Sequence, residues 1–244
     1  MKIQLLSDTH GSPYALHPEA DVIAHAGDFG NGLAAMRQFQ AACNEEGKPY
    51  VFVLGNHDYY HENISDVRLQ LRNEPYLRAG KTVQINGWTF VGGTLFSNFR
   101  QHQVSAEQFE QNCNLAQVSV ADFAYIFDYL PNSQNERRIT PEDYVRLYNE
   151  EWAWIQRFRG AANTIVLTHF PPNAACTAPQ FAESPLNPYF INDIDLTGFA
   201  YWFAGHTHTA MDANIQGCCV VINPLGYPDE IGHNGYRDGC LIEV

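Results

Sequence analysis

The stretch DVIAHAGDFGNGLAAMRQFQAACNEEGKPYVFVLGNHD, at residues 21–58, predicts the fold class. Apolar, strand-length runs begin at residues 21 and 50, and between them residues 32–47 show helical spacing that stops at Gly47. Alternation of strand, helix and strand is typical of a parallel sheet with helices on its faces. We therefore expect an α/β fold.

Three further runs repeat the pattern: KIQLLSDTH at 2–10, NTIVLTHFPP at 163–172 and AYWFAGHTH at 200–208. All five runs are about one strand long, and each ends at Gly, Ser or Thr followed by Asp, His or Asn. Polar residues at the carboxyl ends of such strands gather along one edge, where α/β sheets place their sites. The sequence thus predicts one site assembled from five strand ends.

The segment from Ser97 to Arg159 interrupts this alternation. It holds a polar stretch dotted with aromatic residues and then TPEDYVRLYNEEWAWIQRF, in which Thr140 is a helix cap and Pro141 occupies the first turn. We predict a single domain over residues 1–244, with a helical insertion at about 97–159. The aromatic run at 121–130 is a candidate lid over the site, although such a stripe more often belongs to the core.

Composition excludes several classes of protein. A net charge of −13 disfavours a protein that coats nucleic acid, because the surface repels phosphate backbones. The six cysteines form no CxxC pair, which is typical of reduced thiols in the cytoplasm. The first apolar run is too short for a signal peptide, and no stretch approaches the ~18 apolar residues of a membrane span. We expect a cytoplasmic protein with no membrane partner.

The polar residues at the strand ends form a set suited to metal ions. In GHTH, an extended backbone would aim both imidazoles at one side, although a structural role for this pair is also possible from the pattern alone. Carboxylate, imidazole and amide without thiolate favour Mn²⁺, Fe or Zn²⁺. Seven ligands exceed the needs of one tetrahedral ion, whereas two ions that share a carboxylate would use them all. The candidates are Asp8, His10, Asp28, Asn56, His169, His206 and His208, with His57 beside them.

Five short blocks resemble the calcineurin-like metallophosphoesterase family, in its small bacterial form. They are DTH at 8–10, GD at 27–28, GNHD at 55–58, TH at 168–169 and GHTH at 205–208, in that family's order. The resemblance implies two packed sheets flanked by helices, a β-sandwich around a binuclear metal centre.

The resemblance also implies a role for each residue. Asp8, His10 and His208 would hold one ion, Asn56, His169 and His206 the other, and Asp28 would bridge them. Mn²⁺ is the favoured metal, with Fe or Zn²⁺ as alternatives. His57 would be the general acid.

Three positions depart from patterns within the family. Asn31 stands where the protein phosphatases carry a second Asp, and Asp58 follows His57 where they have Glu. These changes disfavour a protein Ser/Thr phosphatase and leave the carboxylate partner of His57 open, with Asp58 one candidate. In NPLGYPDE at 223–230, Leu225 replaces the usual arginine of an NPRGY segment.

We therefore expect hydrolysis of a small-molecule phosphate mono- or diester. A metal-bridging hydroxide would attack phosphorus, and His57 would protonate the leaving oxygen. A nuclease or cyclic-nucleotide phosphodiesterase using the same site is an alternative, which the acidic charge disfavours. A non-catalytic metal-binding scaffold is another, but such a protein would be expected to have lost ligands or His57.

Overall fold

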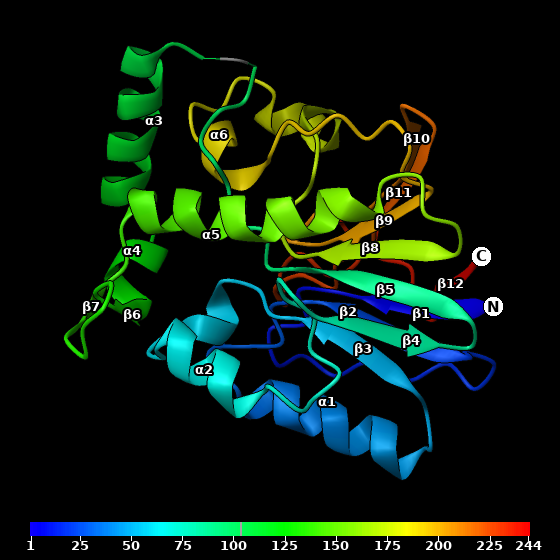
Figure 1. Cartoon of the computed structure of the whole chain (residues 1–244). Coiled ribbons are helices and arrows are strands. Elements are labelled where there is room, and N and C mark those ends of the chain that lie inside the picture. The colour runs from blue at the N-terminus through cyan, green and yellow to red at the C-terminus, as the bar shows by residue number, and fades with distance from the viewer. Residues whose placement is uncertain (103) are drawn as a thin grey trace.

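The computed structural model describes residues 1–102 and 104–244 and contains two stacked sheets with helices outside them (Figure 1). The four-stranded sheet has the order β12-β1-β2-β3, formed by Leu241–Glu243, Lys2–Leu6, Val22–Ala26 and Tyr50–Val53. The six-stranded sheet has the order β10-β11-β9-β8-β5-β4, formed by Met211–Ile215, Cys218–Ile222, Tyr201–Ala204, Thr164–Thr168, Trp88–Gly93 and Thr82–Ile85. The predicted α/β fold with two helix-flanked sheets is confirmed.

The strands β1, β2 and β3 run parallel, as do β5, β8, β9 and β11. Alternate side chains of the two sheets meet in one apolar layer, because successive residues of a strand face opposite sides. That layer includes Leu5, Ala24 and Val53 from one sheet and Leu167 and Phe203 from the other. The two sheets are thereby fixed against each other, and their strand ends share one edge.

Helices cover the outer faces of the sheets. The helices α1 (Ala34–Glu45) and α2 (Ile64–Gln70) lie along the four-stranded sheet, and α5 (Pro141–Ile155) lies across the six-stranded one (Figure 1). The long connection between β8 and β9 contains only the short turns η3 (Ala174–Cys176), η4 (Pro179–Phe181) and α6 (Asn187–Phe190). Among the described residues, no helix combines the length and apolar character that a membrane span requires.

The segment 97–159 contains more than helices. It forms α3 (Ala106–Ser119), α4 (Asp122–Tyr125), a hairpin of β6 (Phe127–Tyr129) and β7 (Glu136–Arg138), α5, and the turn η2 (Gln156–Phe158). Thr140 caps α5 and Pro141 begins it, as predicted. The run 121–130 is not a single helix, because the chain leaves α4 after Tyr125 and enters the hairpin, where it pairs with residues 136–138.

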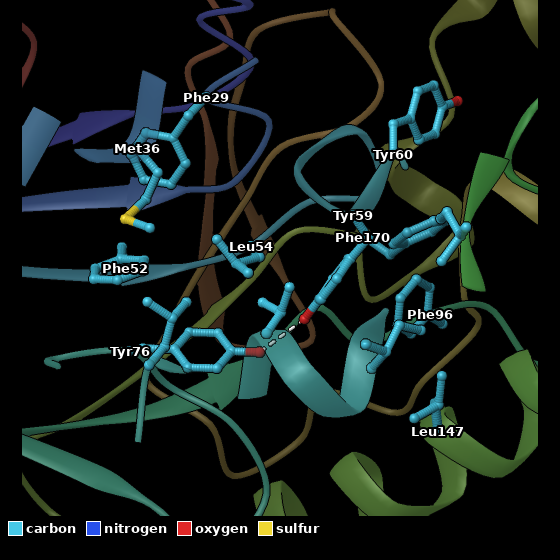
Figure 2. Close-up of a cluster of buried hydrophobic side chains, with 14 of the residues drawn as sticks. Phe29, Met36, Phe52, Leu54, Tyr59, Tyr60, Tyr76, Phe96, Leu147 and Phe170 are labelled. Atoms are coloured by element: carbon cyan, nitrogen blue, oxygen red, sulfur yellow. Dashed lines mark hydrogen bonds between the residues drawn. The ribbon is translucent and has the colours of Figure 1, made fainter. Parts of the chain in front are cut away.

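An apolar cluster ties this segment to the four-stranded sheet (Figure 2). Tyr59 is fully buried, and its hydroxyl forms a hydrogen bond of 2.8 Å with the hydroxyl of Tyr76. Its ring packs near Phe96, and Leu147 of α5 lies in the same cluster. Tyr59 ends the turn η1 (His57–Tyr59), which follows β3. The cluster therefore holds in place the loop that carries Asn56 and His57.

Candidate metal centre

All seven candidate ligands lie just beyond the carboxyl ends of five strands. Three of these strands belong to the four-stranded sheet and two to the six-stranded sheet, so the site spans the edge that the sheets share. The candidates are Asp8 and His10 after β1, Asp28 after β2, Asn56 after β3, His169 after β8, and His206 and His208 after β9.

Five of the seven have a left-handed backbone, which costs roughly 1–2 kcal/mol at a residue other than glycine. Their φ angles are 51° at Asp8, 46° at His10, 57° at Asp28, 71° at His206 and 48° at His208. The expected extended GHTH segment is therefore wrong, because β9 ends at Ala204 and the chain bends at both histidines. Such concentrated strain is characteristic of functional sites.

Glycines precede several of these residues because no side chain fits there. A Cβ at Gly55 would lie 2.1 Å from Asp28 Oδ1, and one at Gly205 would lie 2.7 Å from Asp8 Oδ2. Both glycines let a neighbouring strand end approach a carboxylate closely. This contact explains why the motifs read GN and GH.

We call Asp8, His10, Asp28 and His208 the first group; their ligand atoms lie within 4.8 Å of one another. His208 Nε2 is 3.0 Å from His10 Nε2 and 3.5 Å from Asp8 Oδ1. His10 Nε2 is 3.8 Å from Asp28 Oδ2. Four potential ligand atoms thus converge on one point.

We call Asp28, Asn56, His169 and His206 the second group. His169 Nε2 lies 3.0 Å from Asn56 Oδ1, 3.2 Å from His206 Nδ1 and 3.5 Å from Asp28 Oδ2. All four side chains are buried. Asp28 contributes the same oxygen, Oδ2, to contacts with both groups, as a bridging carboxylate would.

The donor set fits divalent cations. Within each group two imidazole nitrogens face each other, those of His10 and His208 in the first and those of His169 and His206 in the second, and Asp8 Oδ2 is buried without a hydrogen-bond partner among the described residues. Neutral imidazole and carboxylate in this density would repel one another without positive charge between them. Cations at the two groups would satisfy these atoms.

Hydrogen bonds at the far ring nitrogens orient two of the histidines. His169 Nδ1 lies 2.8 Å from the Ala26 carbonyl oxygen, and His208 Nδ1 lies 2.6 Å from Glu230 Oε2. Each acceptor holds a proton on Nδ1, so that Nε2 of the neutral ring presents a lone pair to its group.

The electrostatics of the metal-free protein follow the same arrangement. Burial opposes the charged form of His169, but the Asp28 carboxylate outweighs it and raises the pKa of His169 to about 9. Burial likewise opposes charge on His208, but the Asp8 and Glu230 carboxylates raise its pKa to about 9. Burial lowers the pKa of His10 to about 4. In the metal-free protein, each group therefore contains one histidine that favours the protonated, positively charged form: His208 in the first group and His169 in the second.

His57 lies beside both groups, but its ring contacts residues outside them. Its backbone N–H donates to Asp28 Oδ1 at 2.9 Å, while its ring stacks on Tyr60 with centroids 4.3 Å apart. The ring nitrogens lie 3.0 Å from Asn31 Oδ1 and 3.4 Å from the Tyr227 hydroxyl. His57 is thus near the groups and partly exposed.

Asp58 does not partner His57. Its carboxylate accepts backbone N–H bonds from Asp28, Phe29 and Gly55 at 2.8–2.9 Å, and a longer one from Gly30. Asp58 therefore fixes the turn that carries Asp28.

A cavity of about 520 Å³ opens beside the two groups. Its apolar wall comes from the turn between α3 and α4 and from the connection between β8 and β9, with Val120, Phe181, Leu186 and Phe190 among its residues. Among the described residues, no lysine or arginine lines it. The cavity therefore combines an apolar wall with the polar side chains of the two groups.

Three residues of the site escaped prediction from sequence: Asp122, Tyr227 and Glu230 line the cavity together with five of the candidates, Asp28, Asn56, His57, His206 and His208. Tyr227 stacks on His10 with centroids 4.3 Å apart. The quoted block NPLGYPDE contains Tyr227 and Glu230, and its resemblance to a family segment was the available signal. For Asp122 the sequence offered none.

Comparison with known proteins places the chain in a family. Residues 1–210 match the family model of the calcineurin-like phosphoesterases. No curated protein matches significantly.

Among solved structures, phosphopantetheinyl hydrolase from Mycobacterium tuberculosis is similar, with a TM-score of 0.72, 15% identity, and coverage of 100% of this chain and 95% of that one. A dimetal phosphatase from Danio rerio aligns at 12% identity with a TM-score of 0.49, covering 91% of this chain and 86% of that one. The family uses a dimetal centre, and the two groups of aspartate and histidine described above can bind metal. The chain belongs to the calcineurin-like phosphoesterase family and is a metal-dependent hydrolase of phosphoric ester bonds.

Proposed function

We propose that the protein hydrolyses a small phosphodiester at a binuclear centre. Asp8, His10 and His208 would hold one ion, Asn56, His169 and His206 would hold the other, and Asp28 would be shared by both. The observation that supports this assignment is the convergence of seven strand-end side chains into two groups that share one Asp28 oxygen. Mn²⁺ is the favoured ion, since the donors mix nitrogen and oxygen without thiolate.

When bound, two divalent cations polarise the phosphoryl oxygens and lower the pKa of a coordinated water. His57 protonates the leaving oxygen. Its place supports this role, because its backbone is anchored on Asp28 while its ring stands at the cavity and is not needed as a ligand. Asn31 and Tyr227 contact the two ring nitrogens and orient the ring toward the cavity.

The cavity favours a diester over a monoester. A phosphomonoester carries nearly two negative charges at neutral pH, with a second pKa of about 6, whereas a diester carries one. The lining supplies the carboxylates of Asp28, Asp122 and Glu230 and, within the described residues, no basic side chain besides histidine. Buried Leu225 stands where the resembling segment has arginine. The apolar wall suits the second organic group of a diester.

A paired hydrolysis assay tests this function. Chelator-treated protein reloaded with Mn²⁺ should bind two ions per chain and cleave bis(p-nitrophenyl) phosphate with a kcat/KM at least about 10-fold above that for p-nitrophenyl phosphate. A phosphopantetheinyl ester joins the panel because the similar solved structure carries that name. No hydrolysis of any ester by protein holding two ions would refute the function. A preference for the monoester would refute only the substrate class.

The nuclease alternative is less well supported. The chain carries a net charge of −13, and the cavity offers no basic groove for a polynucleotide backbone. A scaffold without catalysis is disfavoured because every candidate ligand and His57 are in place. We also propose a cytoplasmic location, in line with six free cysteines.

A further inference from the structure

Asp122 is a buried carboxylate surrounded by neutral donors. Its Oδ1 accepts from Asn56 Nδ2 at 2.9 Å and from the Tyr60 hydroxyl at 2.7 Å. Its Oδ2 accepts from the Tyr189 hydroxyl at 2.5 Å and from the Tyr144 hydroxyl. The side chain is fully buried, and its four donors come from three separate parts of the chain: α5, α6 and the two ends of the turn η1. A carboxylate offers about four acceptor positions, so this one is saturated.

Packing alone does not explain this arrangement. Burying a carboxylate among hydroxyls costs free energy, and apolar residues of similar shape would stabilise the same core equally well or better. Three of the four donors are tyrosine hydroxyls, which phenylalanine would remove from the same core, so the partner that needs an acceptor at position 122 for a role beyond packing is the NH₂ end of Asn56. We therefore attribute the carboxylate at position 122 to its hydrogen bond with Asn56.

The amide of Asn56 has two different ends, and only its oxygen can bind a cation. Oδ1 faces His169 Nε2 at 3.0 Å inside the second group, while Nδ2 faces Asp122. A flipped amide would direct NH₂ into the second group and set its oxygen against the Asp122 carboxylate. Both changes are unfavourable, since two acceptors would then face each other.

We propose that Asp122 is a positioning residue of the metal centre, which fixes the amide of Asn56 so that Oδ1 points at the ion of the second group. The inference rests on the metal centre proposed above and deepens it. Asp122 belongs to α4, so the segment 97–159 reaches the metal through this one hydrogen bond. The same oxygen binds Tyr60, whose ring stacks on His57, and thus connects the segment to the proton donor as well.

Metal titration by calorimetry tests the proposal without relying on catalysis. Metal-free wild type titrated with Mn²⁺ should show two steps, and Asp8→Asn identifies the step that belongs to the first group. In Asp122→Leu, affinity at the other step should fall about 10- to 100-fold, the usual loss when the partner of a metal ligand is removed. Asp122→Asn should restore most of it, because its oxygen can still accept from Asn56.

Two controls separate positioning from general damage to the fold. Tyr144→Phe removes a donor from the other carboxylate oxygen and should leave both steps unchanged. In an Asn56→Ala background, Asp122→Leu should cause no further loss, since its effect acts through that amide. Equal loss in both backgrounds, or unchanged affinity in Asp122→Leu, overturns the proposal. A wild type that binds one ion only overturns the binuclear centre itself.

Discussion

The first and second groups share Asp28 but differ in their surroundings. In the first group, His10 and His208 are partly exposed, His208 faces the cavity, and the loop after β11 supplies Tyr227 and Glu230 against them. In the second group every ligand candidate is buried, and Phe170 packs against His206 with ring centroids 4.0 Å apart. An ion in the first group would therefore be more exposed to solvent, and one in the second would exchange with solvent more slowly, although both groups contribute side chains to the cavity.

The two groups nonetheless follow one plan of support. A carboxylate from outside the strand-end motifs contacts a candidate ligand in each group: Glu230 contacts His208, and Asp122 contacts Asn56. These two carboxylates come from connecting segments, whereas the carbonyl that supports His169 belongs to Ala26 of β2. Separate carboxylates for the two groups predict that either metal site can be weakened without the other.

The largest effect is expected from a substitution of Asp28, the residue that both groups share. Asp28→Asn removes the charge that both groups share, so both ions should bind more weakly and hydrolysis should fall at least about 10³-fold. Asp8→Asn should weaken mainly one ion. Elemental analysis and initial rates check this result, with exposed Asp21→Asn as the charge-matched control. Retention of two ions by Asp28→Asn would contradict the bridging role.

His57 should affect catalysis without affecting either ion. His57→Ala should keep two ions per chain and lower turnover of an alkyl phosphate ester by about 10²- to 10⁴-fold, the usual contribution of a general acid. A p-nitrophenyl ester should lose much less, because its leaving group is already a stable anion. Equal losses on both esters would indicate substrate positioning, and loss of metal would make His57 a ligand.

These comparisons also show what the sequence could predict. The seven candidates were found because each follows a strand, and parallel strand ends meet at one edge whatever the loops do. The left-handed bends at His206 and His208 were missed because alternation along a strand was extended past its last residue, Ala204. Asp122 was missed because its partners lie 22 or more residues away from it along the chain, and no local pattern records such a contact.

Removing the support of the first group should mirror Asp122→Leu. Glu230→Ala frees His208 Nδ1 from its acceptor and should weaken the first-group ion about 10- to 100-fold, while the second-group ion is retained. Asp229→Ala, an exposed neighbour in the same loop, serves as the matched control. Calorimetric titration separates the two steps. Loss at the second-group step, or at both equally, would refute separate support of the two groups.

The two groups also share a dependence of metal-free stability on pH. His169 and His208 have folded pKa values of about 9 against about 6.5 for an unfolded histidine, one in each group. Their protonation stabilises the folded state fully below pH 6.5, and this contribution is lost as the pH rises through 9.

The free energy of unfolding of metal-free protein should therefore fall between pH 6.5 and 9, by about 1–3 kcal/mol for each histidine. Bound cations take the place of these protons, so the fall should largely disappear when both sites are loaded. Thermal melts across this range, with and without Mn²⁺, measure it, and His208→Gln should retain about half of the fall. A flat metal-free profile, or a slope that persists with two ions bound, would show that these histidines do not carry positive charge in the folded protein. If His208→Gln instead abolished the whole fall, only the first group would hold a proton, and the two groups would differ in charge as well as in exposure.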